Sequence, residues 1–482
     1  MLNKKINLKQ KNIVLFVYVI ILLLLGPVIV VASNSSSNKK IFLPKVISNK
    51  LSFFSPPNSN KIQSLQTRFS TGDRILITAD NNFNKQAAVK AFASGDYQTA
   101  AELLAVSLKA NPNEPETLIY WNNARAALTG NFVKIATSVP IGGNLDVAQE
   151  ILRGVAQKQQ EINQNGGIDG KLVQVEIAND DNDPELAKQI ATKFVKDDKI
   201  LAVIGHNDSD ASVAAAPIYQ QGGLVMITPT SSANNLSEMG SYIFRATLST
   251  RALADALAGY AVDSARKTNI AICSDSQAEV SKSFQNEFTW AVYDRGGQII
   301  PTKCDFSAPD FNPSEIPSQM VSDGADALLL APSVRKVDKA IEVARANQGR
   351  LTLLGNHSIN TYVTLQQGQT QVNGMVMSVP WHPQINSDNS FTVNSRKQWG
   401  GAVNWRTAMA YDATTAAIAG LELGFSREGV QTALSNLDFS TEGASEAIKF
   451  LPSGDRNSKG TLVRVEPGKK SGTGYDFVSF QP

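Results

Sequence analysis

The sequence predicts an α/β protein with two lobes, each built on a parallel sheet, preceded by a small all-α segment and one transmembrane helix. Two observations carry the α/β prediction. Short apolar runs alternate with helical patterns from Phe132 to the C-terminus, which is typical of βαβ units with parallel strands. Eight or more strands over about 350 residues fit two sheets better than one. We therefore expect two lobes separated by a cleft.

The N-terminus predicts export. Four lysines among the first eleven residues precede an uninterrupted apolar run from Ile13 to Ala32, long enough to span the ~30 Å core of a bilayer. The lysines would stay in the cytoplasm and the rest of the chain would lie outside. We expect residues 1–32 to anchor the protein in the inner membrane. A cleaved signal segment ending at Val30–Ala32 is the alternative.

Two further segments precede the α/β region. Residues 33–83 are rich in Ser, Asn and Lys and predict an extended linker. Residues 84–130 place apolar residues at helical spacing, with a break at Gly95-Asp96 and an end at Asn111-Pro112. The run GDYQTA resembles a tetratricopeptide repeat. One and a half repeats cannot bury their own apolar face, so this segment is either a spacer docked on the main domain or a protein-interaction module.

The α/β region, residues 131–482, predicts strands and helices in strict alternation. The strands are expected at Val133–Ser138, Leu172–Ala178, Leu201–Gly205, Val225–Thr228, Ile270–Cys273, Ile299–Thr302, Ala327–Ala331 and Leu351–Gly355. The helices between them are expected at Asp146–Asn165, Pro184–Asp197, Asp210–Gln220, Ser249–Ser264, Ser281–Gly296, Pro313–Asp323 and Val334–Asn347. The apolar runs lack alternation, as expected for strands covered on both faces.

Hydroxyl side chains follow two of these strands at their carboxyl ends. They are Ser209 and Ser212 after the first strand, and Thr228, Thr230, Ser231 and Ser232 after the second. Ligands of open α/β sheets bind beyond the carboxyl ends of strands, and hydroxyls with free N–H groups at a helix start suit a carboxylate. The pattern predicts a binding site without catalytic groups.

The two cysteines, Cys273 and Cys304, each follow or end a predicted strand. If those strands are parallel neighbours, both thiols lie at one end of the sheet and can pair in an oxidising compartment. Two unpaired buried thiols are the alternative. Metal binding or nucleophilic catalysis has little support, because neither a CxxC motif nor a nearby His accompanies them.

Five segments in a fixed order give a family resemblance. They are EINQNGGIDGKLVQVEIANDDNDPELA (161–187), VIGHNDSDAS (203–212), PIYQQGGLVMITPTSSANNL (217–236), YIFRAT (242–247) and AMAYDAT (408–414). Together they resemble the branched-chain amino-acid-binding proteins, type I periplasmic binding proteins of bacterial ABC importers. The resemblance implies a hinge-bending receptor with a first lobe at about 132–250 and 380–440 and a second at about 251–379 and 441–482.

The resemblance also implies a ligand site. The ligand's carboxylate would contact Ser209, Thr230 and Ser232, with Ser231 beside them. The second lobe departs from the family pattern. His357 stands where the family has a carboxylate for the ligand's amine, and Glu279 and Ser333 stand where it has aromatic residues. An apolar family position falls near Trp405 or Arg406.

These departures put an aliphatic amino-acid ligand in doubt and indicate a more polar one. A buried ammonium needs a negative partner, and the candidates are Asp208, Asp210, Asp275 and Glu279. The acidic run from Asp180 to Asp183 lacks the Gly and distal Glu of a calcium loop. It predicts a helix cap before Pro184.

The leading interpretation is an exported, membrane-tethered solute receptor that binds an amino acid or similar small carboxylate and delivers it to ABC permease subunits. The alternative is a sensor that uses the same fold to signal to a partner protein. No catalytic, phosphate-loop or metal motif is present in the sequence, so we expect neither enzymatic activity nor a cofactor. The net charge of +2 and the lack of a basic stripe argue against nucleic acid.

Overall fold

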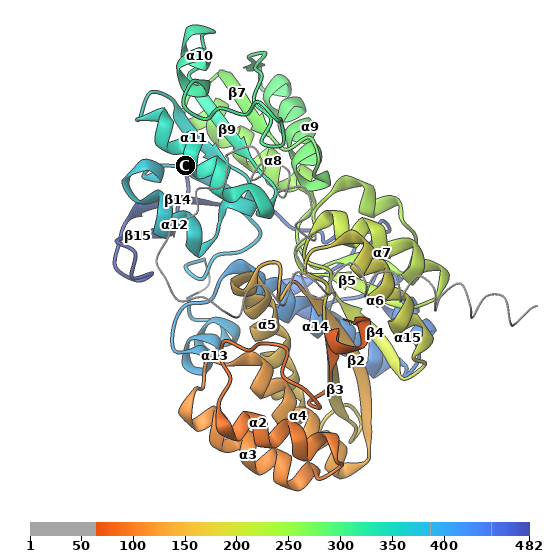
Figure 1. Cartoon of the computed structure of the whole chain (residues 1–482). Coiled ribbons are helices and arrows are strands. Elements are labelled where there is room, and N and C mark those ends of the chain that lie inside the picture. The colour runs from red at the N-terminus through yellow and green to blue at the C-terminus, as the bar shows by residue number, and fades with distance from the viewer. Residues whose placement is uncertain (1–63, 386, 445) are drawn as a thin grey trace, which may run out of the picture. The chain divides into compact units, whose positions relative to one another are not determined.

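The computed structural model describes residues 64–385, 387–444 and 446–482, which belong to one compact unit, Gln63–Pro482. Figure 1 shows two sheet-based lobes with a group of three helices on the first of them. The described residues contain no helix long and apolar enough to cross a membrane. The predicted anchor, residues 1–32, lies outside the described residues.

The first lobe is built on a six-stranded sheet in the order β1-β3-β2-β4-β5-β6. Its strands are β1 (Phe69–Ser70), β2 (Phe132–Val139), β3 (Leu172–Asn179), β4 (Ile200–Ile204), β5 (Val225–Thr228) and β6 (Ile243–Arg245). All neighbours are parallel except β1, which runs antiparallel to β3. The helices of this lobe are α5 (Leu145–Gln164), α6 (Pro184–Lys196), α7 (Ser209–Gln221), α13 (Ser390–Trp399), α14 (Trp405–Leu423) and α15 (Arg427–Ser435).

The second lobe is built on a seven-stranded sheet in the order β15-β14-β11-β10-β9-β7-β8. Its strands are β7 (Asn269–Ser274), β8 (Gln298–Ile299), β9 (Ala327–Ala331), β10 (Thr352–Gly355), β11 (Val376–Val379), β14 (Thr461–Pro467) and β15 (Tyr475–Ser479). Its helices are α8 (Thr250–Gly259), α9 (Glu279–Asp294), α10 (Ile316–Ser322), α11 (Val337–Asn347) and α12 (Tyr362–Gly368), with short turns η5 (Tyr260–Ser264), η6 (Val334–Lys336), η7 (His357–Ile359) and η8 (Gln369–Val372). Strands β14 and β15 are antiparallel to their neighbours, so the prediction of purely parallel sheets is wrong at this edge.

Three segments join the lobes: one between β6 and α8, one between β11 and α13, and one between β13 and β14. A small hairpin, β12 (Thr441–Glu442) with β13 (Ala447–Ile448), precedes the last crossing. Beyond it, Arg456 pairs with Asp412 of α14 in the first lobe. Residues 441–444 and 446–458 therefore lie with the first lobe, although the resemblance assigned them to the second.

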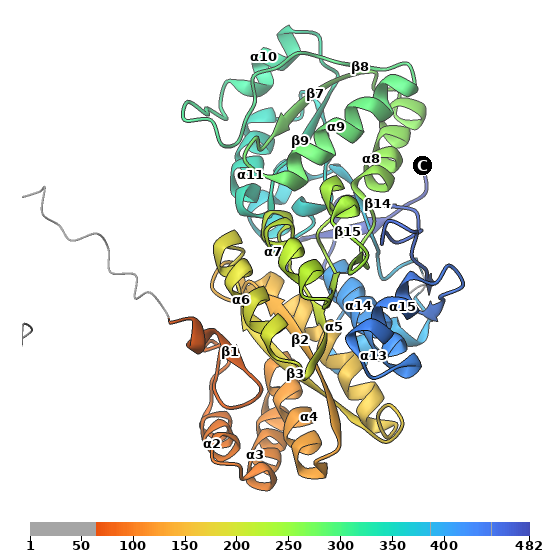
Figure 2. The ribbon, with the colours of Figure 1, turned by 90° about the vertical axis from the view of Figure 1, so that its right-hand side faces the viewer.

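The helical segment packs on the first lobe, as the views in Figures 1 and 2 agree. It consists of α2 (Phe83–Ala93), α3 (Tyr97–Ala110) and α4 (Pro115–Thr129). The buried Asn123 of α4 hydrogen-bonds both the N–H (2.8 Å) and the C=O (2.7 Å) of Val175 in β3, and Gln159 of α5 donates to the Asn123 Oδ1 at 2.8 Å. The structure matches a docked helical segment, whereas its identity as a tetratricopeptide repeat stays a prediction.

Residues 64–82 were expected to belong to the extended linker, and the structure differs there. Strand β1 pairs with β3, and Phe69 packs edge-on against Phe194 of α6 at 5.6 Å between ring centroids. Arg68 forms an ion pair with Asp181 at 2.6 Å. Further along, Glu116 of α4 accepts hydrogen bonds from the N–H groups of Leu76 and Ile77 (2.7 and 3.2 Å). This part of the chain is therefore packed against the first lobe and its helices.

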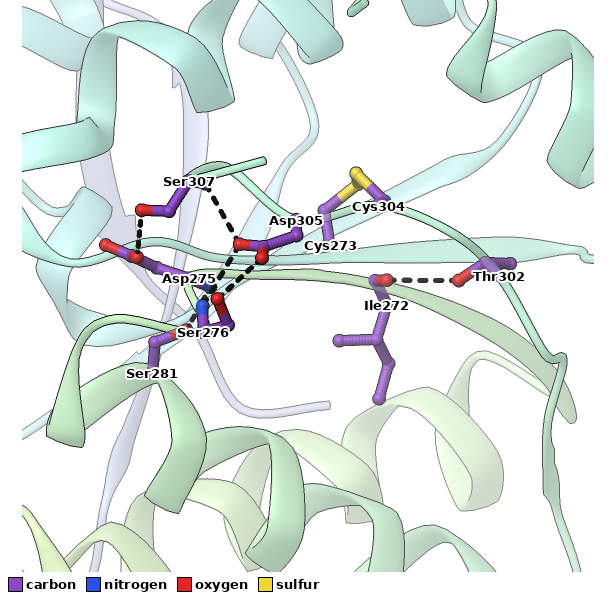
Figure 3. Close-up of a disulfide and its surroundings, with 9 residues drawn as sticks. All are labelled: Ile272, Cys273, Asp275, Ser276, Ser281, Thr302, Cys304, Asp305 and Ser307. Atoms are coloured by element: carbon purple, nitrogen blue, oxygen red, sulfur yellow. Dashed lines mark hydrogen bonds between the residues drawn. A yellow bond between two sulfur atoms is a disulfide. The ribbon is translucent and has the colours of Figure 1, made fainter. Parts of the chain in front are cut away.

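A disulfide joins Cys273, in β7, to Cys304, with 4.7 Å between their Cα atoms (Figure 3). Strand β8 lies parallel and next to β7, which brings the chain after β8 alongside the end of β7. The adjacent Asp305 accepts hydrogen bonds from the N–H and hydroxyl of Ser276 (3.0 and 2.6 Å). The sequence was compatible with either a disulfide between Cys273 and Cys304 or two free thiols. The structure shows the disulfide.

Candidate functional site

The hydroxyl residues lie where the sequence placed them, beyond the carboxyl ends of β4 and β5. Most of them hold the two turns together. Thr230 Oγ1 donates to the carbonyl of Asn207 at 2.9 Å, and Thr228 Oγ1 and Ser231 Oγ donate to the carbonyl of His206 at 2.8 and 3.2 Å. These hydrogen bonds join the turn after β5 to the turn after β4.

A buried hydrogen-bonded set of side chains, centred on His206, supports the loop after β4. His206 Nδ1 lies 2.7 Å from Asp180 Oδ2, and its Nε2 lies 3.2 Å from the Tyr219 hydroxyl. Burial alone would raise the pKa of Asp180, but hydrogen bonds with His206 and Ser138 hold it below its usual value. His206 thus supports the turn after β4. Asp183 caps α6 by accepting from the N–H groups of the second and third helical residues, which confirms the predicted cap.

A small cavity of ≈20 Å³ separates these turns from the second lobe. It is lined by Asn207, Asp208, Ser209 and Thr230 of the first lobe, by Val280, Val334, His357 and Ser358 of the second, and by Trp405 and Arg406 at the start of α14. Four of the eight predicted ligand residues therefore line one cavity. Its volume accommodates about one water molecule, so any ligand there requires the lobes to part.

His357 forms the second lobe's side of this cavity. Its Nε2 lies 3.3 Å from Ser232 Oγ of the first lobe, and its ring meets Trp405 edge-on with 5.6 Å between centroids. Burial, reinforced by the nearby charge of Arg406, lowers the pKa of His357 to about 3. The imidazole is therefore neutral at pH 7 and supplies no negative charge for an ammonium group.

The other four predicted residues lie outside the cavity wall, although Ser232 contacts His357, which lines it. Ser231 hydrogen-bonds the backbone beneath it. Ser333 donates to Asp275 at 2.7 Å, while its neighbour Val334 lines the cavity. Glu279 lies between the lobes, where it accepts from Asn235 at 3.2 Å and pairs with Lys282. The roles of these residues in ligand binding stay predictions.

The carboxylates considered for an ammonium are engaged by the protein itself. Asp210 forms an ion pair with Arg335 of η6, across the lobe boundary. Asp208 lies 3.6 Å from Arg335 Nε, and burial, opposed by Arg335, raises the pKa of Asp208 to about 6. Asp275 accepts from Ser307 at 2.6 Å and from Ser333. None of them is an uncommitted partner for a positive ligand group.

A larger cavity of ≈320 Å³ lies between the lobes beside the first. Its walls are the beginnings of α5 and α14 on one side and η6, α11 and the start of α12 on the other; Arg335, Asn404 and Arg406 are among its lining residues. The resemblance had narrowed one family position to Trp405 or Arg406, and both residues line the smaller cavity. Arg335 and Asn404 carried no pattern in the sequence that marked them.

Comparison with known proteins identifies the class that this fold and site define. The family described as periplasmic binding protein matches residues 133–471, and the chain belongs to that family. An amino acid binding protein of Pseudomonas aeruginosa is 34% identical over 105 residues, 22% of this chain and 28% of the relative. The leucine-, isoleucine-, valine-, threonine-, and alanine-binding protein of the same organism is 27% identical over 36% of this chain and 47% of the relative. The chain thus aligns with less than half the length of either relative.

Solved structures agree with this fold. A leucine-binding protein from Thermotoga maritima superposes with a TM-score of 0.64 at 20% identity, covering 73% of this chain and 99% of the other. A solute-binding protein of an ABC transporter from R. palustris, in complex with 4-hydroxybenzoate, gives a TM-score of 0.63 at 14% identity, covering 73% and 96%. At these identities the likeness establishes the two-lobed fold.

Proposed function

We propose that this protein is the extracytoplasmic receptor of an ABC importer, that it is tethered by residues 1–32, and that it binds an amino acid or similar small carboxylate by closure of its lobes. One observation carries the proposal. Ser209 and Thr230 of the first lobe line one small interlobe cavity together with His357 of the second. A ligand held by the first pair is buried when the second lobe closes over it.

The carboxylate half of the proposed site follows from its position on a helix. Ser209 is the first residue of α7, whose N-cap is Asp208. N–H groups at a helix start are unpaired within the helix and carry partial positive charge, so they attract an anion. Thr230 of the neighbouring turn lines the same cavity, and its hydroxyl would turn from the Asn207 carbonyl, to which it donates in this structure, to donate to a ligand. The helix start and the Ser209 hydroxyl suit one carboxylate at the first lobe's surface.

The contacts between the lobes explain how closure and binding are linked. Arg335 bridges to Asp210, and Asn234 of the first lobe donates to Glu287 of α9 at 2.7 Å. These bonds break when the lobes part, so the closed form is favoured by them and by the ligand together. The connecting segments between the sheets are the proposed hinge.

The relatives support a small carboxylate without naming it. The Pseudomonas protein is described as binding five amino acids, and the R. palustris structure contains 4-hydroxybenzoate. Both ligand types carry a carboxylate, and only the first type carries an ammonium group. A shared carboxylate fits a site whose first-lobe half carries hydroxyl groups. The group that binds the rest of the ligand would then lie on the second lobe.

The proposal is tested by thermal shift and calorimetry of the purified full-length chain against the twenty amino acids and a set of small carboxylates. A ligand at 100 times its dissociation constant adds about 2.7 kcal/mol to the stability of the folded state. The double substitution Ser209→Ala with Ser232→Ala should weaken that ligand by at least about 10-fold, because a hydrogen bond to a charged group contributes about 1.5–3 kcal/mol.

Ser395→Ala is the matched control for that experiment, since it also removes a buried hydroxyl, but one in α13 that donates to Gln157 and lines neither interlobe cavity. Its ligand affinity should match that of the unsubstituted protein. Unchanged affinity in the double variant, with the fold intact, would show that the hydroxyl turns are not the site.

A sensor remains the second candidate, favoured by the helices α2, α3 and α4 docked on the first lobe. Uptake and signalling assays in cells that lack this protein distinguish an importer receptor from a sensor. Loss of uptake of the identified ligand supports the importer. Unchanged uptake together with loss of a ligand-dependent response in a partner protein supports the sensor.

A further inference from the structure

Arg406 is a buried arginine that the protein does not pair with an acid. It is the second residue of α14 and its exposed fraction is 4%. Its Nη1 donates to the carbonyl of Asn360 at 2.9 Å, and its guanidinium stacks on the Trp405 ring at 4.4 Å from the centroid. Its Nε has no hydrogen-bond partner. Among the described residues no carboxylate forms an ion pair with it.

A buried arginine without an ionic partner lowers the stability of the folded protein. Arginine is almost never fully buried unless paired, and removing a charge from water costs several kcal/mol even after relaxation. Burial lowers the pKa of Arg406 to about 10, with Glu150 acting in the opposite direction, so the group is still a cation at pH 7. A positive charge that the fold itself leaves uncompensated points to a partner that is not part of the chain.

The surroundings of Arg406 contain helix ends that attract an anion, and also the carboxylates of Asp146, Glu150 and Asp338 in the wall of the larger cavity. Arg406 lines both interlobe cavities, of ≈320 and ≈20 Å³. Two long helices, α5 and α14, begin at the wall of the larger cavity, and helix N-termini carry partial positive charge. The nearest acid that influences Arg406, Glu150, is itself occupied by Arg153 at 3.0 Å and by the N–H of Asn404 at 3.3 Å.

We propose that Arg406 binds an acidic group of the ligand and that the ligand is therefore a small diacid, with one carboxylate at the Ser209 hydroxyl and the start of α7 and the other on the Arg406 guanidinium. A planar guanidinium binds a carboxylate through two parallel hydrogen bonds. The neutral His357, in place of an acid, offers an ammonium group no compensating charge. The site thus selects net-anionic ligands over aliphatic zwitterions. This inference rests on the proposed function and specifies its ligand class.

The test measures the affinities of the purified full-length chain for four probes: glutarate, L-glutamate, L-leucine and 4-methylpentanoate. The unsubstituted protein should bind glutarate or L-glutamate at least about 10-fold more tightly than either monocarboxylate. Arg406→Gln keeps a hydrogen-bond donor and removes the charge, and should weaken the diacids by about 10- to 100-fold while leaving the monocarboxylates unchanged. Arg396→Gln, at an exposed position of α13, is the matched control and should change neither.

Stability separates a binding role from a structural one. Since Arg406→Gln removes an unpaired buried charge, its melting temperature without ligand should equal or exceed that of the unsubstituted protein. Arg406→Lys keeps the charge without the planar fork, and its diacid affinity should fall between the two. Equal diacid affinity in all three proteins, or a lowered melting temperature with unchanged affinity, would overturn the inference. Tightest binding of L-leucine, insensitive to Arg406, would overturn it and leave the receptor function standing. Binding of no probe and no other small carboxylate would overturn both.

Discussion

Asp208 predicts an unusual dependence of stability on pH. This carboxyl group is only 5% exposed, and burial, opposed by Arg335, raises its pKa from 3.8 to about 6. Between these two values the folded protein holds a proton that the unfolded chain has released. The free energy of unfolding contributed by this group is therefore highest below pH 3.8 and falls as the pH rises toward 6.

The size of the effect follows from the pKa difference. A shift of one unit corresponds to 1.36 kcal/mol, so ionisation of Asp208 lowers the stability by about 3 kcal/mol at pH 7. Asp208→Asn replaces the carboxyl group with a neutral group of the same shape, which still accepts from the N–H of Asp210. The variant should match the parent near pH 4 and exceed it by about 3 kcal/mol at pH 7.5.

Urea unfolding followed by tryptophan fluorescence between pH 4 and 8 measures this difference. Asp310→Asn removes an exposed carboxyl group and should leave the pH dependence unchanged. A constant difference between Asp208→Asn and the parent across the whole range would refute the raised pKa. The same variant also tests the site: if Asp208 held a ligand's ammonium group, Asp208→Asn would weaken binding, whereas a net-anionic ligand should bind at least as tightly.

Three further outcomes are expected. Reduction, or replacement of Cys273 and Cys304 by Ala, should lower the stability by about 3.5 kcal/mol, because the bond closes a loop with a sequence separation of 31; calorimetry with and without dithiothreitol measures it. Lys85→Met leaves two buried glutamates without their partner (3.0 and 2.6 Å) and should cost about 3–5 kcal/mol, whereas the exposed Lys90→Met should cost almost nothing in the same urea titration. Arg335→Gln breaks an interlobe ion pair whose arginine is 41% exposed. Because solvent screens this ion pair, the affinity for the ligand should fall less than about 5-fold. The loss of affinity should vanish at high salt, in calorimetric titrations that compare the variant with the parent.

Local pattern predicted most of the two sheets. Strands β5 and β9 have the bounds expected from their apolar runs, and β2, β3, β4, β7 and β10 differ from expectation by one residue at one or both ends. Strands β6, β11, β14 and β15 were missed. Strands β6 and β15 lie at sheet edges, and β14 and β15 join their sheet antiparallel, outside the βαβ alternation on which the prediction was based. Residues 64–82 were also missed, because a two-residue strand is stabilised by its neighbours and not by its own sequence.

The candidate site shows where sequence reasoning stops. Ser209 and Thr230 were predictable because the carboxyl ends of parallel strands meet at one edge. In the second lobe, His357 lines the cavity as predicted, whereas next to Glu279 and Ser333 it is the following residues, Val280 and Val334, that line it. One residue turns a side chain by about 100° around a helix axis, and how the lobes meet determines which residue faces the cavity. Arg406 is notable only once its burial and lack of an ionic partner are known.

The measurement that tests the account most directly is the distance between the lobes with and without ligand. Spin labels at Glu185→Cys in α6 and Glu342→Cys in α11, both exposed, report that distance by double electron–electron resonance. With the small carboxylate that gives the largest thermal shift, the distribution should narrow to a single distance. Without it, a second, different distance should be populated. Saturating ligand that leaves the distribution unchanged would contradict binding by closure of the lobes.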